Sequence, residues 1–478
     1  MISFTKSYIA KTKILATLGP ASDSAEMLKN MLAKGADAFR LNFSHGSYDY
    51  YTKLFNTLEQ IRKETRIPFS ILIDLQGPKI RIGEVEGTIT LKEGEAFEIT
   101  TDEIIGNEKR VSTSFKELPN DVKPGEIILI NDGLVKLKVN EIKGNSVFCT
   151  VLEGGEISSK KGLNLPHTKL SVPSLTEKDI SDLMFALQFP VDFVALSFVR
   201  EASDIHKLRS LLIEQGKTPR IIAKIEKPEA VENFVSILDA ADGIMVARGD
   251  LGVEMETEKV PIIQKSIIEK CNKAGKLVIT ATQMLESMIE NAIPTRAEAS
   301  DVANAVLDGS DAVMLSAETS VGKHPALVVE TMNNIIKTAE KNIPPKRYDD
   351  YYVPDKLESE VFESTAQSVA EIADKLNTKA IVVFTYSGRT AETISKYRPE
   401  TPILAFSNNY ETLSRLNLKW GIEPFHIEGL NEKDEGIQYV IEKLKSSKYV
   451  SEGDLLMFTA VAPVSEKERR SWLHFMVV

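Results

Sequence analysis

The chain has 478 residues, of which 42% are hydrophobic and 27% are charged, which is the composition of an ordinary soluble globular protein. A chain of this length is expected to form about three domains. The formal net charge of −11 argues against a general binder of nucleic acid or of anionic membranes. An anionic substrate would therefore have to meet a local cluster of cations.

The two cysteines and the N-terminus bear on the compartment. Cys149 and Cys271 lie far apart and form no C-x-x-C motif, which suggests a reducing compartment and no structural zinc site. Lysines interrupt residues 1–13, so these residues do not read as a secretory signal. No apolar run approaches the roughly 20 residues that a membrane helix needs. We therefore expect a soluble, cytoplasmic protein.

Short apolar segments alternate with helical patterns through most of the chain. Strand–helix alternation repeated eight times predicts an α/β protein with a (β/α)8 TIM barrel, and a doubly wound open sheet is the alternative. Thr295 and Glu298 have the spacing of a capping box at a helix start. The predicted strands are Lys13–Gly19, Ala38–Phe43, Ser70–Leu75, Asp192–Phe198, Arg220–Ile225, Gly243–Ala247, Leu277–Ala281 and Ala312–Leu315.

More than 100 residues separate the third predicted strand from the fourth. Short strand patterns and Gly-containing turns fill this segment, which predicts an inserted all-β lid domain at 79–168, a small barrel or sandwich. The catalytic barrel would then comprise 1–78 and 169–341. A Pro- and charge-rich segment at 342–357 reads as a linker, and 358–478 as a C-terminal open α/β domain with a regulatory role.

The stretch Ile221–Asp250 has the pattern of strand, helix and strand, and charged residues follow each apolar run. Lys224 and Glu226 end the first run, and Asp250 follows the second. The carboxyl ends of neighbouring parallel strands meet at one rim, where α/β proteins place their chemistry. Surface salt bridges are the alternative reading. Two carboxylates with room for ligand oxygens suit Mg²⁺ or Mn²⁺.

Three cations at or just past the ends of predicted strands are suited to hold a phosphoryl group. They are Arg40, Arg81 and Lys224. The chain has no G-x-x-x-x-G-K-[ST] motif, so a nucleotide would have to bind by another device.

With these residues in place, the chain resembles the pyruvate kinase family. Nine motifs carry the resemblance, and they occur in the family's order over nearly the whole barrel and the hinge of the insertion. They are Thr12–Ser22, Arg40–Gly46, Asp74–Gly83, Lys160–Pro166, Ile222–Lys227, Asp242–Gly252, Thr280–Ser287, Pro294–Asp308 and Met314–Thr319.

The resemblance implies phosphoryl transfer from phosphoenolpyruvate to ADP, giving pyruvate and ATP in the last step of glycolysis, by a homotetramer. It places the divalent metal on Glu226 and Asp250. Lys224 would lie across the transferring phosphoryl group, assisted by Arg40 and Arg81. Backbone N–H groups near Gly249 and Asp250, with the Thr282 hydroxyl, would hold the substrate carboxylate.

By the same resemblance, the enolate would receive its proton from Thr282 or Ser316 through water, and neither hydroxyl is a strong acid alone. The nucleotide would contact Arg40, Asn42, His45, Arg81 and Lys161, although His45 also reads as a surface or capping residue and Lys161 as a solvated one.

One position departs from the family pattern. Many members have glutamate after Gly-Pro and bind K⁺ through the positions of Asn42, Ser44 and Asp74, whereas here Lys79 follows Gly77-Pro78. An ammonium can supply the charge that K⁺ would give, so K⁺ is possible but is not expected to be required. A Lys79 side chain that points to solvent is the alternative.

The C-terminal domain contains a candidate effector site. A predicted strand is followed by hydroxyls, a glycine and a helix start, which together can cradle a phosphate. An ordinary capped turn is the alternative. The tail 461–478 has no glycine, which weakens the case for fructose 1,6-bisphosphate as the ligand. The residues of this turn are Thr385, Ser387, Gly388, Arg389 and Thr390.

Two other functions fit part of this pattern. A metal-dependent pyruvate-enolate aldolase or lyase would share the barrel and the Glu/Asp pair, but it would not need the lid, Arg81 or Lys161. A catalytically inactive metabolite sensor would use only the C-terminal domain, and the intact rim residues argue against it.

Overall fold

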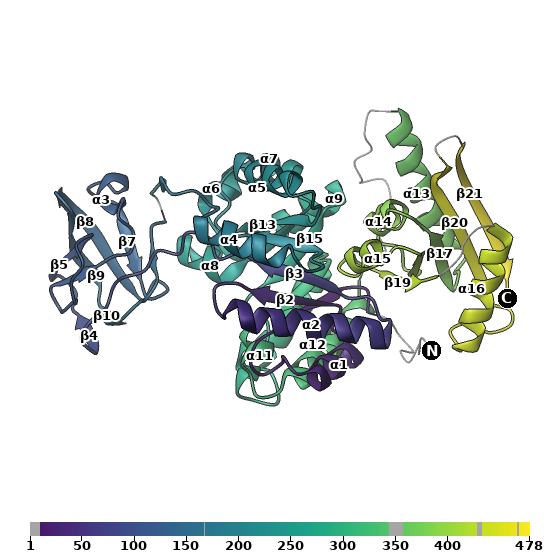
Figure 1. Cartoon of the computed structure of the whole chain (residues 1–478), viewed down its shortest axis with the longest axis horizontal. Helices are drawn as coiled ribbons and strands as arrows, with labels where there is room; N and C mark the ends of the chain where they lie inside the picture. The colour runs from purple at the N-terminus through teal and green to yellow at the C-terminus, as the bar shows by residue number, and fades with distance from the viewer. Residues whose placement is uncertain (1–9, 167, 344–356, 428–432, 466–467) are drawn as a thin grey trace.

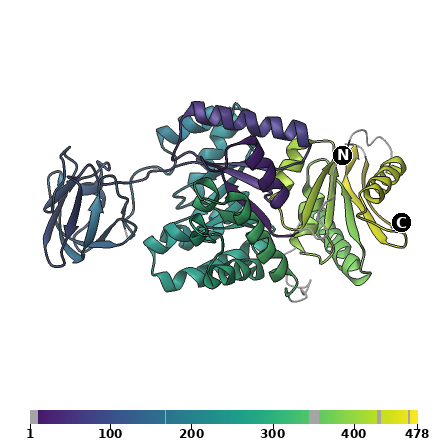
Figure 2. The same cartoon turned by 90° about the horizontal axis from the view of Figure 1, so that it is seen from below.

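The computed structural model describes residues 10–166, 168–343, 357–427, 433–465 and 468–478. Three bodies lie in a row: an all-β domain at one end, a barrel in the middle and a C-terminal α/β domain at the other end (Figure 1). Two extended segments join the all-β domain to the barrel (Figure 2). Most of the predicted linker at 342–357 falls on 344–356, outside the described residues. None of the described helices is both long and apolar enough to cross a membrane.

Eight parallel strands form a closed barrel in the order β1-β16-β15-β14-β13-β12-β3-β2. The predicted TIM barrel is therefore confirmed, and the doubly wound alternative is wrong. The strands are β1 Lys13–Thr17, β2 Ala38–Asn42, β3 Ser70–Asp74, β12 Phe193–Leu196, β13 Arg220–Ile225, β14 Gly243–Ala247, β15 Leu277–Ala281 and β16 Ala312–Leu315.

The predicted bounds of the last four strands are those of the structure. The first four were predicted too long at their carboxyl ends, and the fourth was also predicted to begin one residue too early. The ladder stops there because the chain turns to present polar side chains at the rim. Phe198, for example, has a left-handed backbone with φ of 56° and lies beyond the end of β12.

Helices surround the barrel, and two of them begin with a full capping box. Thr295 and Glu298 form the predicted box, and Thr176 and Asp179 form a second one. The helices are α1 Ala25–Lys34, α2 Tyr48–Thr65, α4 Glu177–Ala186, α5 Ala202–Glu214, α6 Pro228–Glu232, α7 Phe234–Ala240, α8 Arg248–Glu254, α9 Val260–Ala274, α10 Arg296–Asp308, α11 Ala317–Ser320 and α12 Pro325–Glu340.

The insertion is all-β, with a six-stranded sheet, a two-stranded sheet and one short helix around its own apolar core. It leaves the barrel just past the end of β3 and returns before α4, so it lies beside the catalytic rim. Its elements are β4 Thr88–Leu91, β5 Ala96–Thr100, β6 Arg110–Ser112, α3 Leu118–Asp121, β7 Ile127–Ile130, β8 Val135–Lys143, β9 Ser146–Glu153, β10 Gly155–Ser158 and β11 Leu163–Asn164.

The C-terminal domain is an open sheet in the order β19-β18-β17-β20-β21, with β21 antiparallel at the edge. The tail 461–478 was not assigned to a strand from the sequence, and in the structure it contains the end of β20 and all of β21. The elements are α13 Leu357–Lys375, β17 Ala380–Phe384, α14 Arg389–Lys396, β18 Ile403–Ser407, α15 Tyr410–Leu416, β19 Ile422–His426, α16 Lys433–Ser446, β20 Leu455–Ser465 and β21 Glu468–Val477.

Ion pairs attach this domain to the amino ends of the barrel strands, the face opposite the rim. Lys13 at the start of β1 is 2.9 Å from Glu423, and Arg220 at the start of β13 pairs with Glu392. Arg398 lies 2.7 Å from Asp311, directly before β16. The two ends of the barrel thus face different domains.

Candidate active site

The Lys224 ammonium is the centre of the rim. Its Nζ donates to Ser197 Oγ at 2.8 Å and lies 2.8 Å from Glu226 Oε1 and 3.3 Å from Asp74 Oδ1. Burial alone would lower the pKa of Lys224, but Asp74, Glu226 and Asp250 outweigh burial and raise it. Lys224 is therefore a fixed cation at neutral pH, paired with Glu226 at the end of its own strand and with Asp74 at the end of β3, while Asp250 adds a third negative charge.

Arg40 on β2 extends this network. Its Nε donates to Asp74 Oδ2 at 2.7 Å, and its Nη1 donates to Thr17 Oγ1 at 3.0 Å. Burial favours a raised pKa for the Asp74 carboxyl, yet the charges of Lys224 and Arg40 lower it below the ordinary value. Asp74 is thus ionised and orients both cations.

The two predicted metal ligands lie in unlike surroundings. Glu226 is 2% exposed, and its Oε2 accepts a hydrogen bond from the Phe198 N–H at 2.8 Å. Burial, and the negative charge of Asp250, raise the pKa of Glu226 against the effect of Lys224. Asp250 is exposed in the first turn of α8. Carboxylate oxygens that repel each other, with one side open, fit a hard divalent cation that keeps other oxygen ligands.

The described residues contain no group of three or more His, Cys, Asp or Glu side chains arranged to hold a metal ion. Two carboxylates plus substrate oxygens remain a fitting donor set for Mg²⁺, which often binds protein through only one or two carboxylates.

Thr282, just past β15, has a strained backbone. Its φ is 71°, an outlier for a β-branched residue that costs about 1–3 kcal/mol. Its hydroxyl accepts from the Gly249 N–H at 2.8 Å and donates to the Ala281 carbonyl at 2.6 Å, while Arg248 Nη2 donates to the Thr282 carbonyl at 2.6 Å. This backbone conformation turns the Thr282 hydroxyl toward Gly249 in the first turn of α8.

Ser316 precedes α11 and is half-buried. Its N–H donates to Glu318 Oε2 at 2.6 Å, and Glu318 also accepts from the Leu285 N–H at 3.2 Å. Glu318 therefore joins the loop after β15 to the loop after β16.

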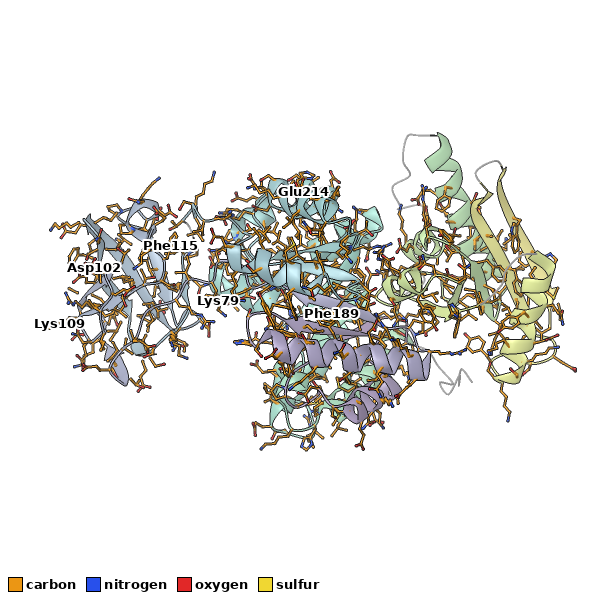
Figure 3. All side chains as sticks on the ribbon, in the orientation of Figure 1. Lys79, Asp102, Lys109, Phe115, Phe189 and Glu214 are labelled. Carbon is orange, nitrogen blue, oxygen red and sulfur yellow. The ribbon has the colours of Figure 1, made fainter. Side chains whose placement is uncertain are left out.

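Three cations, Lys79, Arg81 and Arg40, surround His45 on the side of the rim that faces the insertion. Lys79 is exposed at the junction of barrel and insertion (Figure 3). Burial, followed by the charges of Lys79, Arg81 and Arg40, lowers the pKa of His45. The lowered pKa favours the neutral form of the exposed His45 side chain at pH 7, and His45 shares this region with three of the predicted cations.

The remaining nucleotide-side and monovalent-cation residues occupy the same side of the rim. Asn42 ends β2, and its Oδ1 accepts from the Ser44 N–H at 3.3 Å. Lys161 is half-buried on the segment that returns from the insertion, where its carbonyl accepts from the Ile82 N–H at 3.0 Å. Gly162 forms a bridge with Arg81, so both connecting segments are tied together.

The predicted effector turn is a compact loop backed by α15. Gly388 has φ of 86°, and its N–H donates to Thr385 Oγ1 at 3.0 Å. Thr390 is buried, Ser387 is exposed, and the Arg389 guanidinium lies over the Phe362 ring at 4.4 Å. This turn lies in the C-terminal domain, away from the catalytic rim.

Sequence reasoning missed one group beside the rim. Lys227 and Glu254 form a buried ion pair at 2.9 Å, and Asn164 Nδ2 donates to Glu254 Oε1 at 2.8 Å. Glu254 is four residues after Asp250 on α8, which is the only local signal that could have found it. The group joins the returning segment of the insertion to the metal-side strand and helix.

Comparisons with known proteins agree with this architecture. Residues 9–329 match the family model of the pyruvate kinase barrel domain, and residues 363–473 match that of the pyruvate kinase alpha/beta domain. The chain is 44% identical over 462 residues to a pyruvate kinase of Clostridium perfringens, covering 95% of this chain and 97% of that protein. It is 43% identical over 467 residues to one of Corynebacterium glutamicum, covering 97% of each. A solved structure of a pyruvate kinase from Cryptosporidium parvum superimposes with a TM-score of 0.90 at 38% identity, covering 98% of this chain and 96% of that one.

Asp74 pairs with both Arg40 and Lys224, so its loss should lower the stability of the barrel. Replacing Asp74 in Asp74→Asn leaves Arg40 without its buried partner and removes one of the two counter-charges of Lys224. We expect a loss of about 3–5 kcal/mol in the free energy of unfolding of the barrel, measured by urea denaturation. The control Ser197→Ala removes one neutral acceptor of Lys224 and should cost about 1 kcal/mol. Equal losses in the two variants would contradict the network.

Proposed function

The chain belongs to the pyruvate kinase family, and we propose that it transfers the phosphoryl group of phosphoenolpyruvate to ADP, giving pyruvate and ATP, with the rim around Lys224 as its active site. The position of the Lys224 ammonium carries this assignment. It is a permanent cation at a strand end, beside two carboxylates suited to a divalent metal. Its charge would neutralise the negative charge on the oxygens of the transferring phosphoryl group, with Arg40 and Arg81 assisting.

The family generally uses Mg²⁺ and K⁺. We assign the divalent metal, Mg²⁺ or Mn²⁺, to Glu226 and Asp250. When bound, it supplies Lewis-acid stabilisation of negative charge on substrate oxygens. A metal at this position would also replace Lys224 as the counter-charge of Glu226, which would leave the ammonium freer to meet the phosphoryl group.

The substrate carboxylate is assigned to the start of α8. The Gly249 N–H donates to Thr282 Oγ1 in this structure, so a carboxylate there would compete with that hydroxyl or share it. Freed from this bond, Thr282 can bind the carboxylate, and it or Ser316 can pass a proton to the enolate through water.

The nucleotide is assigned to the side of the rim that faces the insertion. Arg40, Asn42, His45, Arg81 and Lys161 would contact it. Two of the five lie on the segments that connect the insertion to the barrel, so closure of the insertion would bring cations to the phosphates and exclude water. The family is usually tetrameric, and we propose the same assembly for this chain.

Replacing the central cation tests the assignment. Lys224→Met keeps most of the length of the unbranched side chain and removes its charge, so we expect kcat for ATP formation from phosphoenolpyruvate, ADP and Mg²⁺ to fall about 100-fold to 1,000-fold. Lys207→Met, on the exposed face of α5, is the matched control and should keep full activity. An unmodified protein that is folded but forms no ATP would refute the function, whereas an active Lys224→Met variant would refute only the role of Lys224.

We further propose that the Lys79 ammonium replaces K⁺. Lys79 is close enough to His45 for its positive charge to lower the pKa of that histidine. The positions that would otherwise hold K⁺, Asn42, Ser44 and Asp74, lie on the same side.

Activity in a buffer without sodium or potassium tests this substitution. The unmodified protein should gain little from added KCl, while Lys79→Glu should lose activity and recover it with K⁺, because a carboxylate restores the need for a counter-charge. Lys79→Met should lose activity without becoming responsive to K⁺. Strong activation of the unmodified protein by K⁺ would rule the idea out.

We also propose that the turn from Thr385 to Thr390 binds a phosphorylated effector. The hydroxyls, the left-handed Gly388 and the exposed Arg389 support it. Phosphorylated metabolites should shift the phosphoenolpyruvate saturation curve. Arg389→Gln should raise the effector concentration needed for that shift about tenfold or more. Lys379→Gln, on the same domain, is the control. A flat response to every phosphorylated metabolite would remove this site.

A further inference from the structure

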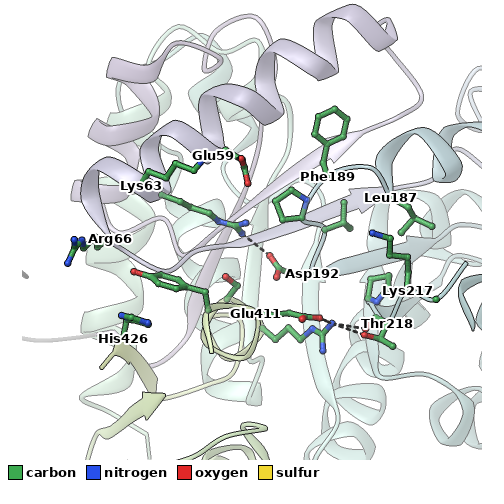
Figure 4. A pocket seen from close by; sticks show the side chains of 18 residues that line it. Glu59, Lys63, Arg66, Leu187, Phe189, Asp192, Lys217, Thr218, Glu411 and His426 are labelled. Carbon is green, nitrogen blue, oxygen red and sulfur yellow. Dashed lines mark hydrogen bonds and ion pairs between the residues drawn. The ribbon is translucent and has the colours of Figure 1, made fainter. Parts of the chain in front are cut away.

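Two of the cavities that the described residues form lie at opposite ends of the barrel. The larger, of about 700 Å³, lies at the amino ends of the strands, between the barrel and the C-terminal domain (Figure 4). The smaller, of about 50 Å³, lies at the carboxyl ends, between the barrel and the insertion. This smaller cavity has room for only about one or two water molecules, so the insertion packs directly against the rim here. Its lining includes Asp250, Val253 and Glu254 on or beside α8 and Asp132, Gly162 and Asn164 on the insertion.

Lys227 and Glu254 form a buried ion pair beside this small cavity. The Lys227 ammonium is 2.9 Å from Glu254 Oε2, and the two side chains are 3% and 2% exposed. Apart from this ion pair, Glu254 Oε2 accepts no hydrogen bond from the residues that the structure describes. A buried charge is costly when its partner is missing, so the two side chains stay together. The ion pair therefore holds the two backbone segments that carry it at a fixed separation.

The same two segments carry the carboxylates that we assign to the divalent metal. Lys227 directly follows Glu226 and has an extended backbone, with φ of −123° and ψ of 148°. Successive side chains of an extended backbone point to opposite sides, so Glu226 faces Lys224 while Lys227 faces α8. Asp250 and Glu254 are four residues apart on α8, which is about one helical turn. The ion pair thus lies next to both metal ligands without being one of them.

Asn164 connects the insertion to this ion pair. Its Nδ2 donates to Glu254 Oε1 at 2.8 Å, and hydrogen bonds to a charged acceptor are stronger than neutral ones. Asn164 lies on β11 and pairs with Leu129 on β7, so it is fixed in the six-stranded sheet of the insertion. The turn after β7 also lies near α8, because a methyl group placed on Gly133 would be 3.8 Å from Val253. The insertion is therefore docked on the helix that carries Asp250.

From these contacts we infer that Glu254 is a positioning residue that couples binding of the divalent metal to docking of the insertion. Glu254 is held by Lys227 and Asn164, and it fixes α8, and with it Asp250, relative to Glu226. Because α8 has only seven residues and ends at Glu254, it moves as one rigid element. Docking of the insertion raises the affinity for the metal, and the bound metal favours docking to the same extent. The coupling rests on the metal site proposed above at Glu226 and Asp250.

Binding of Mn²⁺ to the full chain, without substrate or nucleotide, tests the coupling. The electron paramagnetic resonance signal of free Mn²⁺ gives the Kd. Asn164→Ala removes the hydrogen bond to Glu254, and Asn164→Leu removes it while keeping the volume of the side chain. Neither variant changes a charge or a metal ligand, and both should raise the Kd for Mn²⁺ about 5-fold to 50-fold. Asn140→Ala is the matched control, because Asn140 is an exposed residue of the insertion whose Nδ2 donates to Thr150, and it should keep the Kd.

The reciprocal effect separates coupling from a loss of stability. In the unmodified protein, Mn²⁺ should slow hydrogen exchange in the two segments that connect the insertion to the barrel. These segments include the Leu163 N–H, which donates to the Ile80 carbonyl at 3.0 Å. In Asn164→Ala, saturating Mn²⁺ should slow this exchange much less. A variant that merely weakens the fold would speed exchange equally with and without the metal, and that result would contradict the coupling.

Asp250→Asn shows whether the measured Mn²⁺ occupies the assigned site, and it should raise the Kd more than either Asn164 variant. If it does so while both Asn164 variants bind Mn²⁺ as tightly as the unmodified protein, the coupling is wrong and the metal assignment stands. If Asp250→Asn keeps the Kd, or if the folded unmodified protein binds no Mn²⁺, the metal assignment fails and the coupling fails with it. Formation of ATP is measured separately, so failure of the proposed reaction is distinguished from both results.

Discussion

The burial of one ammonium between two carboxylates governs the whole rim. Lys224 can keep its charge in the barrel only because Asp74 and Glu226 approach it to about hydrogen-bonding distance. Lys224 and Glu226 belong to the end of β13 and Asp74 ends β3, with β12 between these two strands, so closure of the barrel and assembly of the site are one event. A buried charge of this kind costs several kcal/mol unless it is paired, and a strand displaced from the ring would leave it unpaired.

The two ends of the barrel have different roles. The carboxyl ends of the strands present charge to the insertion, and the amino ends are attached to the C-terminal domain by ion pairs such as Arg398–Asp311. Each barrel strand is only four to six residues long, so a change at either end lies within about 20 Å of the other. This short, rigid path gives a physical basis for influence of the C-terminal domain on the rim.

Strain at the rim has a structural cause. Thr282 and Phe198 both have left-handed backbones within two residues of the end of a strand. The strained turns place the Thr282 hydroxyl beside α8 and the Phe198 N–H against Glu226. Hydrogen bonds from Arg248 and the close packing of neighbouring loops hold these conformations, which an isolated segment would not adopt.

The sequence by itself determined the eight barrel strands, the capping box of Thr295 and Glu298 and the charged residues at the strand ends, because apolar periodicity and strand polarity are local properties of the chain. It placed Lys224 and Glu226 on one strand end and Asp250 on the next. Only the tertiary structure decided the pairings of Lys224 with Asp74 and of Asn164 with Glu254. These contacts join residues distant in the chain, and no local pattern specifies which side chains meet when a barrel closes. The stretch Ile221–Asp250 therefore contains the components of the site, and the fold supplies their partners.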